Sequence, residues 1–294
     1  MDAPSQPTNP WDRAAESLGN VVELQHVNLQ VPDPLLATAF YVSALGLTRD
    51  PYLMTGIDNM WANAGISQFH LPTGTAQVLR GTVGLVLPDR ARLLHRLDRA
   101  RRWLDGTRYA FAEAEDHVAV TCPWGNRIRC HAPDAARFGR ITLGMPYVEF
   151  DVAPGTLDGL ARFYDEVVGA PATRADGALR IRVAREQHLV FRETDAPQPA
   201  FDGHHVQLAF VDFGGVHAKL AGLGLISRED SEHQYRFTKL LDPADGRLLF
   251  EVEHEIRSTT HPLFARPLVN RDAAISNTRY APGLEAAQWA MPPA

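Results

Sequence analysis

Short runs of alternating hydrophobic and polar residues along the chain are followed by stretches in which hydrophobic residues recur at helical spacing. Residues Glu23–Val31 alternate and predict a strand. Residues Leu35–Leu45 carry hydrophobic side chains at helical spacing and end at Gly46, which predicts a helix. Three further strand-like runs follow: Leu47–Leu53, Asn59–Ala64 and Ile66–Leu71. The first part of the chain therefore predicts the order strand, helix and three strands.

This order recurs three more times. The later units begin with predicted strands at Thr82–Leu87, Tyr147–Val152 and His205–Val211, and continue with predicted helices at Arg90–Leu104, Leu157–Val168 and Val216–Leu223. The helix ends of units one and three also share a sequence echo, AFYVSALGL at Ala39–Leu47 and RFYDEVVGA at Arg162–Ala170. Equivalent positions in the first strands, His26, Thr82, Tyr147 and His205, are 56, 65 and 58 residues apart (82−26, 147−82, 205−147). Such regularity indicates one repeated supersecondary unit.

The last strand of each unit follows the first at a nearly constant distance. His70 comes 44 residues after His26, and Glu251 comes 46 residues after His205. In the middle units, Arg129 follows Thr82 by 47 residues and Arg192 follows Tyr147 by 45. We use these offsets to assign equivalent positions in all four units.

The repeat predicts an α+β protein in which four βαβββ modules form two paired, cup-shaped sheets. We divide the chain into an N-terminal tail, a first half of two modules, a second half of two modules and a C-terminal arm. The respective bounds are 1–21, 22–133 (modules 22–77 and 80–133), 145–256 (modules 145–195 and 203–256) and 257–294.

Composition narrows the function classes. The 294 residues carry a formal net charge of −6, which argues against a non-specific nucleic-acid binder. No run approaches the ~20 apolar residues needed to span a bilayer, and the polar start is unlike a signal peptide. Only two cysteines occur, Cys122 and Cys130, which excludes a disulfide scaffold. We therefore expect a cytoplasmic protein with no membrane or nucleic-acid partner.

Several of these motifs carry a resemblance to a known superfamily. The segments HVNLQV followed by PD, FYVSALGL, and DPADGRLLFEVE, in four βαβββ units over about residues 22–256, resemble the vicinal oxygen chelate superfamily of glyoxalases and extradiol dioxygenases. The resemblance implies that units pair into open cups. It also implies that the first and last strands of each unit offer the metal ligands.

Ligand-type residues concentrate in the two outer units. His26, His70, His205 and Glu251 occupy their four equivalent positions, whereas units two and three offer Thr82, Arg129, Tyr147 and Arg192. Arginine stays protonated and cannot ligate a metal. If unit one pairs with unit four, one cup holds all four ligand-type residues; sequential pairing would split them. We predict the outer pairing, with a metal-free inner cup whose Arg129 and Arg192 repel cations and can clamp an anion.

Some assignments remain alternatives at this point. His70 is a fourth ligand or a catalytic acid/base beside a three-residue site. Glu253 shares a strand face with Glu251 and replaces it if the register differs by two residues. Tyr235 and Arg236 point to opposite faces of their strand, and we favour Tyr235 as the catalytic residue in the cup. The segment Glu255–Arg271 is an arm covering a sheet edge, or a lid that brings His261, Arg266 or Arg271 to the pocket mouth.

The resemblance and these residues together predict an enzyme that chelates a small oxygenated substrate on a divalent metal. Two histidines and a carboxylate suit Fe(II), which we favour, with Zn, Ni, Co or Mn as alternatives. Four units with one outer site resemble ring-cleaving dioxygenases, our leading interpretation. The third histidine, and the lack of a Tyr or His just before the DP turn, favour a glyoxalase-type isomerase or lyase instead. A metal-free antibiotic-binding protein is the remaining alternative. A small-molecule substrate is the expected partner, and a homodimer is compatible with the sequence.

Overall fold

The computed structural model describes residues 13, 16–51, 53, 58–266 and 268. Most of the predicted N-terminal tail and the end of the C-terminal arm, including Arg271, lie outside the described residues. The predicted strand Leu47–Leu53 is also only partly described.

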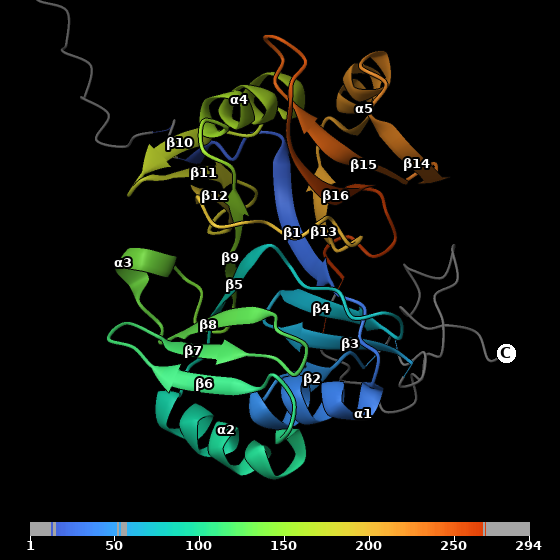
Figure 1. The fold of residues 1–294 in the computed structure, drawn as a ribbon. Helices are drawn as coiled ribbons and strands as arrows, with labels where there is room; N and C mark the ends of the chain where they lie inside the picture. Colours follow the sequence, from blue (N-terminus) through green and yellow to red (C-terminus); the bar gives the residue numbers. More distant parts are fainter. Residues whose placement is uncertain (1–12, 14–15, 52, 54–57, 267, 269–294) are drawn as a thin grey trace, which may run out of the picture.

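Each unit begins with a strand and a helix and closes with a small run of strands (Figure 1). Unit one contains β1 (Val21–Asn28), α1 (Pro34–Ala37), its π-helical continuation η2 (Thr38–Ala44), β2 (Thr48–Arg49), β3 (Asn59–Ala64) and β4 (Ser67–Pro72). Unit two contains β5 (Gly81–Val86), α2 (Arg90–Leu104), β6 (Ala110–Glu113), β7 (Val118–Thr121) and β8 (Arg127–His131), followed by the linking α3 (Ala135–Phe138).

The second half repeats this arrangement. Unit three contains β9 (Gly144–Val152), α4 (Leu157–Arg162), its continuation η3 (Phe163–Val168), β10 (Ala172–Ala175), β11 (Ala178–Arg182) and β12 (His188–Glu193). Unit four contains β13 (His205–Phe210), α5 (Phe213–Gly222), β14 (Ile226–Ser231), β15 (Gln234–Leu241) and β16 (Leu248–Ser258). The short edge strands β10 and β14 are the first of the three closing strands expected in units three and four. Their residues were not located from the sequence, because they are polar and exposed and lack the alternation of a half-buried strand.

Two eight-stranded sheets result, and each combines two units. The outer sheet has the order β14-β15-β16-β13-β1-β4-β3-β2, so units one and four share it. The inner sheet has the order β10-β11-β12-β9-β5-β8-β7-β6 and contains units two and three. In each sheet the two first strands pair antiparallel at the centre, β1 with β13 and β5 with β9. The predicted α+β class with paired modules is confirmed.

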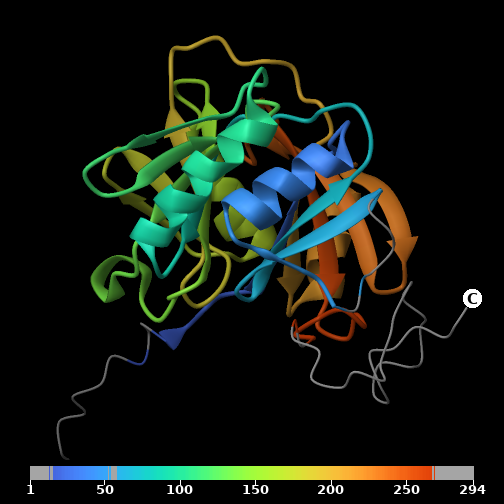
Figure 2. The ribbon, with the colours of Figure 1, turned by 90° about the horizontal axis from the view of Figure 1, so that it is seen from below.

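The helices join the two sheets in pairs. Figures 1 and 2 show α1 and α2 side by side, and in Figure 1 α4 and α5 lie together at the opposite end of the molecule. Arg96 of α2 donates from Nε and Nη2 to the carbonyl oxygens of Ala44 and Leu45, over 3.3 and 3.1 Å. Lys219 of α5 donates to the Glu166 carbonyl oxygen over 2.8 Å. Each contact links a helix of one sheet to a helix of the other.

The echoed sequences AFYVSALGL and RFYDEVVGA coincide with the π-helical segments η2 and η3. Their tyrosines, Tyr41 and Tyr164, are fully buried in the core. Of the helices that the structure describes, none is long and apolar enough to cross a membrane.

A buried histidine makes stability depend on pH. His254 on β16 is fully buried, with Nδ1 3.0 Å from the Val252 carbonyl oxygen and Nε2 2.8 Å from the Tyr164 hydroxyl. Burial lowers the pKa of His254 to about 4. Between that value and the unfolded pKa of about 6.5, the unfolded chain binds a proton that the native ring does not. The contribution of His254 to the free energy of unfolding therefore falls as the pH falls through this window.

Replacing this histidine should remove that part of the pH dependence. Between about pH 7 and about pH 4, wild-type protein should lose on the order of 3 kcal/mol more unfolding free energy than His254→Gln. Urea unfolding of both proteins at the two pH values measures the difference. Equal losses would show that His254 is not held neutral by the fold.

Candidate metal centre

Three histidines from three strands converge on one face of the outer sheet. His26 lies on β1, His70 on β4 and His205 on β13, and a ligand-capable atom of each lies within 4.8 Å of the others. The His26 ring centroid is 5.6 Å from that of His70 and 5.5 Å from that of His205. The antiparallel register explains this proximity, because His26 pairs with Gln207 and Asn28 with His205 on the two central strands. Residues 179 positions apart (205−26) therefore face one another.

Neighbouring side chains favour one tautomer of two rings. His26 Nδ1 lies 3.2 Å from Gln25 Oε1, and His205 Nδ1 lies 3.3 Å from Glu253 Oε1 and 3.5 Å from Arg236 Nη1. In the tautomer that donates Nδ1–H to the two oxygens, each Nε2 keeps a free lone pair. Both Nε2 atoms are buried and have no hydrogen-bond partner among the described residues. An orphaned, inward-facing imidazole lone pair of this kind fits a metal ion, and the carboxamide and carboxylate behind the rings resemble outer-shell supports.

The third ring is held differently. His70 stacks on Trp61 with ring centroids 3.8 Å apart, and its Nε2 lies 2.6 Å from Asn59 Oδ1. Burial and the nearby His205 lower the pKa of His70 to about 3. Burial also holds the pKa of His26 well below its usual value. The two rings are therefore neutral at physiological pH, the form that binds metals.

The structure does not bring Glu251 into the histidine cluster. In the β13–β16 pairing, Glu253 lies beside His205 and Glu255 lies beside Gln207. Glu251 pairs instead with Lys239 of β15, and its carbonyl oxygen accepts a hydrogen bond from Arg80. The alternative residue, Glu253, is closer to the cluster, whereas Glu255 was missed by the sequence analysis.

Internal symmetry identifies Glu255 as the counterpart of His70. In unit one the register places His70 beside Asn28, and in unit four it places Glu255 beside Gln207. Asn28 and Gln207 each stand two residues beyond the first-strand histidine. The offset is 44 residues in unit one (70−26) but 50 in unit four (255−205). The assumption of a constant offset fails because β14 and β15 span six and eight residues, against two and six in β2 and β3.

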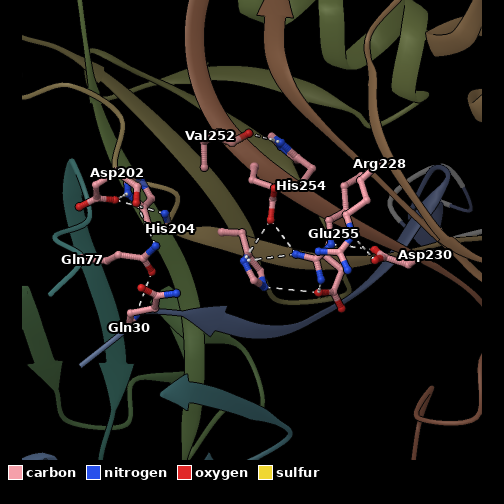
Figure 3. A network of polar contacts seen from close by, with 12 residues as sticks. Gln30, Gln77, Asp202, His204, Arg228, Asp230, Val252, His254 and Glu255 are labelled. Carbon is pink, nitrogen blue, oxygen red and sulfur yellow. Dashed lines mark hydrogen bonds and ion pairs between the residues drawn. The ribbon is translucent and has the colours of Figure 1, made fainter. Parts of the chain in front are cut away.

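Two arginines hold the Glu255 carboxylate in place. Arg236 Nη2 lies 2.5 Å from Oε2 and Arg257 Nη2 lies 2.6 Å from Oε1, while His205 Nε2 is 3.4 Å from Oε2. Figure 3 shows Glu255 within the polar network that also contains Asp230 and Arg228. Burial opposes ionisation of this group, but the charge of Arg257 and the contact with His205 outweigh burial and hold its pKa well below the usual value. The carboxylate is therefore ionised and points at the same His205 nitrogen that lacks a hydrogen bond.

Tyr235 is behind the sheet rather than in the cup. It pairs with Ile256, its hydroxyl donates to the Phe213 carbonyl oxygen over 3.3 Å, and its ring packs against Phe213 and His217 of α5. The next residue, Arg236, faces the cup and binds Glu253 as well as Glu255. Our prediction that Tyr235 faces the cup was wrong. Neighbouring side chains on a strand point to opposite faces, and nothing in the sequence indicates which of Tyr235 and Arg236 points inward.

The C-terminal arm reaches the floor of the cup. Arg266 forms a fully buried ion pair with Asp50 at 2.5 Å and lies 3.2 Å from Gln68 Oε1. Gln68 pairs with His26 in the sheet register. Gln25 Nε2 donates to the Leu263 carbonyl oxygen over 2.9 Å. The described part of the arm thus places Arg266 in a buried contact beside Gln68, and the choice between an arm and a lid stays open; Arg271 lies outside the described residues.

A second group of ligand-type residues lies at one end of the inner sheet. Asp116, His117 and His131 offer ligand atoms within 4.8 Å of one another. Asp116 is already bound to Arg137 at 2.9 Å and to His117 at 2.6 Å. The metal-free inner cup therefore stays a prediction.

Comparisons with known proteins identify the fold. No protein-family model matches the sequence, and no curated protein matches it. Among solved structures, a Bacillus subtilis protein described as a "putative dioxygenase" is similar at 15% identity, covering 82% of this chain and 86% of its own, with a TM-score of 0.55. Glyoxalase I from Zea mays is similar at 12% identity, covering 81% and 92%, with a TM-score of 0.53. The chain therefore has the vicinal oxygen chelate fold, and these identities extend no further than the fold.

Metal affinity should depend on the histidines and not on Glu251. His26→Ala and His205→Ala should each weaken divalent-metal binding by more than about hundredfold, because outer-shell changes alone cost 10- to 100-fold. Glu251→Gln should bind like wild type, since its carboxylate is not in the cluster. Equilibrium dialysis against Zn²⁺ with metal analysis measures the affinities. Loss of metal in Glu251→Gln, with retention in His205→Ala, would contradict this site.

Tyr235→Phe should change stability but not metal affinity. Its hydroxyl only bonds a main-chain carbonyl, so the free energy of unfolding should fall by about 1 kcal/mol. Tyr109→Phe is the matched control, because that hydroxyl donates to the Leu97 carbonyl oxygen over 2.8 Å. Both variants should unfold at similarly lower urea concentrations and bind Zn²⁺ like wild type. A selective loss of Zn²⁺ binding in Tyr235→Phe would contradict the placement of this residue outside the metal site.

Proposed function

We propose that the protein is a divalent-metal-dependent enzyme whose metal is held in the outer cup and takes two oxygens of a small substrate. The observation that carries the proposal is the pair of buried Nε2 atoms of His26 and His205. The His26 atom has no hydrogen-bond partner among the described residues, and the His205 atom has only a long contact of 3.4 Å to the Glu255 carboxylate. A buried polar atom left without a partner is costly unless a ligand completes it. A metal-free antibiotic-binding protein would have no use for these nitrogens.

The leading candidate for the metal-holding set is His26, His205 and Glu255. Two imidazoles and one carboxylate are the donor set typical of non-haem Fe(II) enzymes. When bound, Fe(II) supplies O2 activation and a template for vicinal substrate oxygens. Arg236 and Arg257 hold Glu255 ionised and oriented, a supporting role common around ligating carboxylates.

We propose ring cleavage by an extradiol-type dioxygenase as the reaction, with His70 as the acid/base. His70 is anchored by Asn59 and Trp61 and faces the same space as the two proposed ligands. An anionic phenolate beside this ring would raise its low pKa, because a nearby opposite charge favours the protonated imidazole. His70 would then accept and return a substrate proton.

A glyoxalase-type isomerase or lyase is the second candidate, and one observation favours it. His70 belongs to the same 4.8 Å cluster as His26 and His205, so it is close enough to be a metal ligand itself. Three imidazoles suit Zn or Ni as well as Fe. Tyr235 is absent from the cup, which leaves the dioxygenase candidate without the tyrosine that we expected for it.

His70→Gln separates the two candidates. The acid/base role predicts near-wild-type Fe(II) affinity with at least about hundredfold slower O2-dependent cleavage of catechols or hydroquinones. The ligand role predicts loss of metal itself. Metal analysis of protein prepared under anaerobic conditions, followed by oxygen uptake with a catechol and hydroquinone panel, reports both quantities. His95→Ala is the control, because His95 is exposed on α2, belongs to neither group of ligand-type residues and should change neither quantity.

Failure of the broader proposal would look different. Protein that binds no divalent metal, with or without reconstitution, would favour the metal-free binding module. The location and partners stay proposals too: a small-molecule substrate, and a reducing cytoplasm in keeping with two buried free thiols, Cys122 and Cys130.

A further inference from the structure

The inner sheet contains a cavity of its own, which is separate from the histidine cluster. Its volume is about 390 Å³, and it lies against β8, β9, β11 and β12. Cavities of roughly 300–1,000 Å³ are typical of small-molecule sites. The proposed metal site lies in the other sheet, so this cavity requires a separate explanation.

Arginine dominates the lining of this cavity. Four arginines line it, Arg129, Arg137, Arg180 and Arg192, against two acids, Glu149 and Asp176. The lining therefore carries a formal charge of +2 (4−2) in a chain whose net charge is −6. Such local reversal of charge concentrates anions in a concave site.

Three of the four guanidinium groups already contact an acid. Glu149, which is buried, receives Arg129 Nη1 at 3.0 Å and Arg192 Nε at 3.4 Å. Arg137 Nη2 lies 2.9 Å from Asp116. Glu149 thus neutralises part of the charge of Arg129 and Arg192, and Arg192 Nη1 also donates to the Asp176 carbonyl oxygen over 3.0 Å.

Arg180 is different. It has no acidic partner among the described residues, although it lines the cavity. Its position on β11 lies beside Val190, which also lines the cavity.

Tyr147 also lines the cavity, but its hydroxyl proton is already used. His131 Nδ1 donates to the Asp116 carbonyl oxygen over 3.2 Å, so His131 Nε2 accepts from the Tyr147 hydroxyl over 2.8 Å. Recognition therefore falls to the arginines, whose planar guanidinium groups match the paired oxygens of carboxylates and phosphates.

We infer that this cavity binds a small oxyanion, a polycarboxylate or a phosphate ester, with Arg180 as its principal recognition residue and Arg129 and Arg192 completing the clamp. The inference does not rest on the proposed metal chemistry. The inner sheet would thus bind an anion, whereas the outer sheet is proposed to bind a metal cation.

Isothermal titration of the full-length protein with inorganic phosphate and with citrate, at constant ionic strength set by chloride, tests this inference. At least one should bind saturably with a dissociation constant below about 1 mM. Tighter citrate binding identifies the polycarboxylate class, and tighter phosphate binding identifies the phosphate class. Absence of saturable binding of both anions would overturn the inference.

Variants assign the binding to the cavity. Arg180→Gln should weaken the bound anion at least about tenfold, and Arg180→Lys should restore part of the affinity because charge is kept while the fork is lost. Arg92→Gln is the matched control, since that side chain on α2 is 82% exposed and lies outside the cavity. Wild-type anion affinity in Arg180→Gln would contradict the assignment.

A further variant distinguishes binding from a merely structural role for the arginines. Glu149→Gln removes the internal competing anion, so citrate or phosphate should bind about tenfold more tightly and raise the unfolding temperature of the variant more than that of wild type. If the arginines served only to neutralise Glu149, the variant would be less stable and no anion would restore it.

Discussion

The antiparallel pairing of β1 with β13 holds the outer cup together, and the candidate metal centre depends on its register. That pairing sets His26 opposite Gln207 and Asn28 opposite His205, so the two histidines approach across the centre of the sheet. A slip of one residue would turn one of them into the hydrophobic core. The 179 residues between the histidines impose little cost, because loop-closure entropy grows slowly with length.

Equivalent positions in the two sheets have diverged in charge. In the outer sheet, His26, His70 and His205 form a group that could hold a metal ion, and two arginines hold the nearby Glu255 carboxylate. In the inner sheet, Arg129 occupies the position equivalent to His70, since it pairs with Gly84 two residues beyond Thr82. One fold therefore carries a cation-type and an anion-type environment, and the helix pairs bring the two sheets together.

The sequence predicted most of the framework because the repeat is encoded locally. Alternation and helical spacing identified the four units, and the concentration of His26, His70 and His205 in the outer units pointed to the sheet that they share. Errors arose where the answer depends on hairpin length or strand parity. Because the hairpin of unit four is longer, the counterpart of His70 is Glu255 and not Glu251. Because side chains alternate along β15, Arg236 and not Tyr235 faces the cup. The buried pair Arg266–Asp50 joins segments 216 residues apart, and no local pattern announces such a contact.

The central claim is that the two outer units share one metal site built on the β1–β13 pairing. Anomalous diffraction from crystals grown with a divalent transition metal tests it most directly, because the metal-edge signal locates the ion without reference to activity. The account predicts a strong anomalous peak between the Nε2 atoms of His26 and His205. A strong peak elsewhere, such as at Asp116 and His131, with none at this position would contradict it.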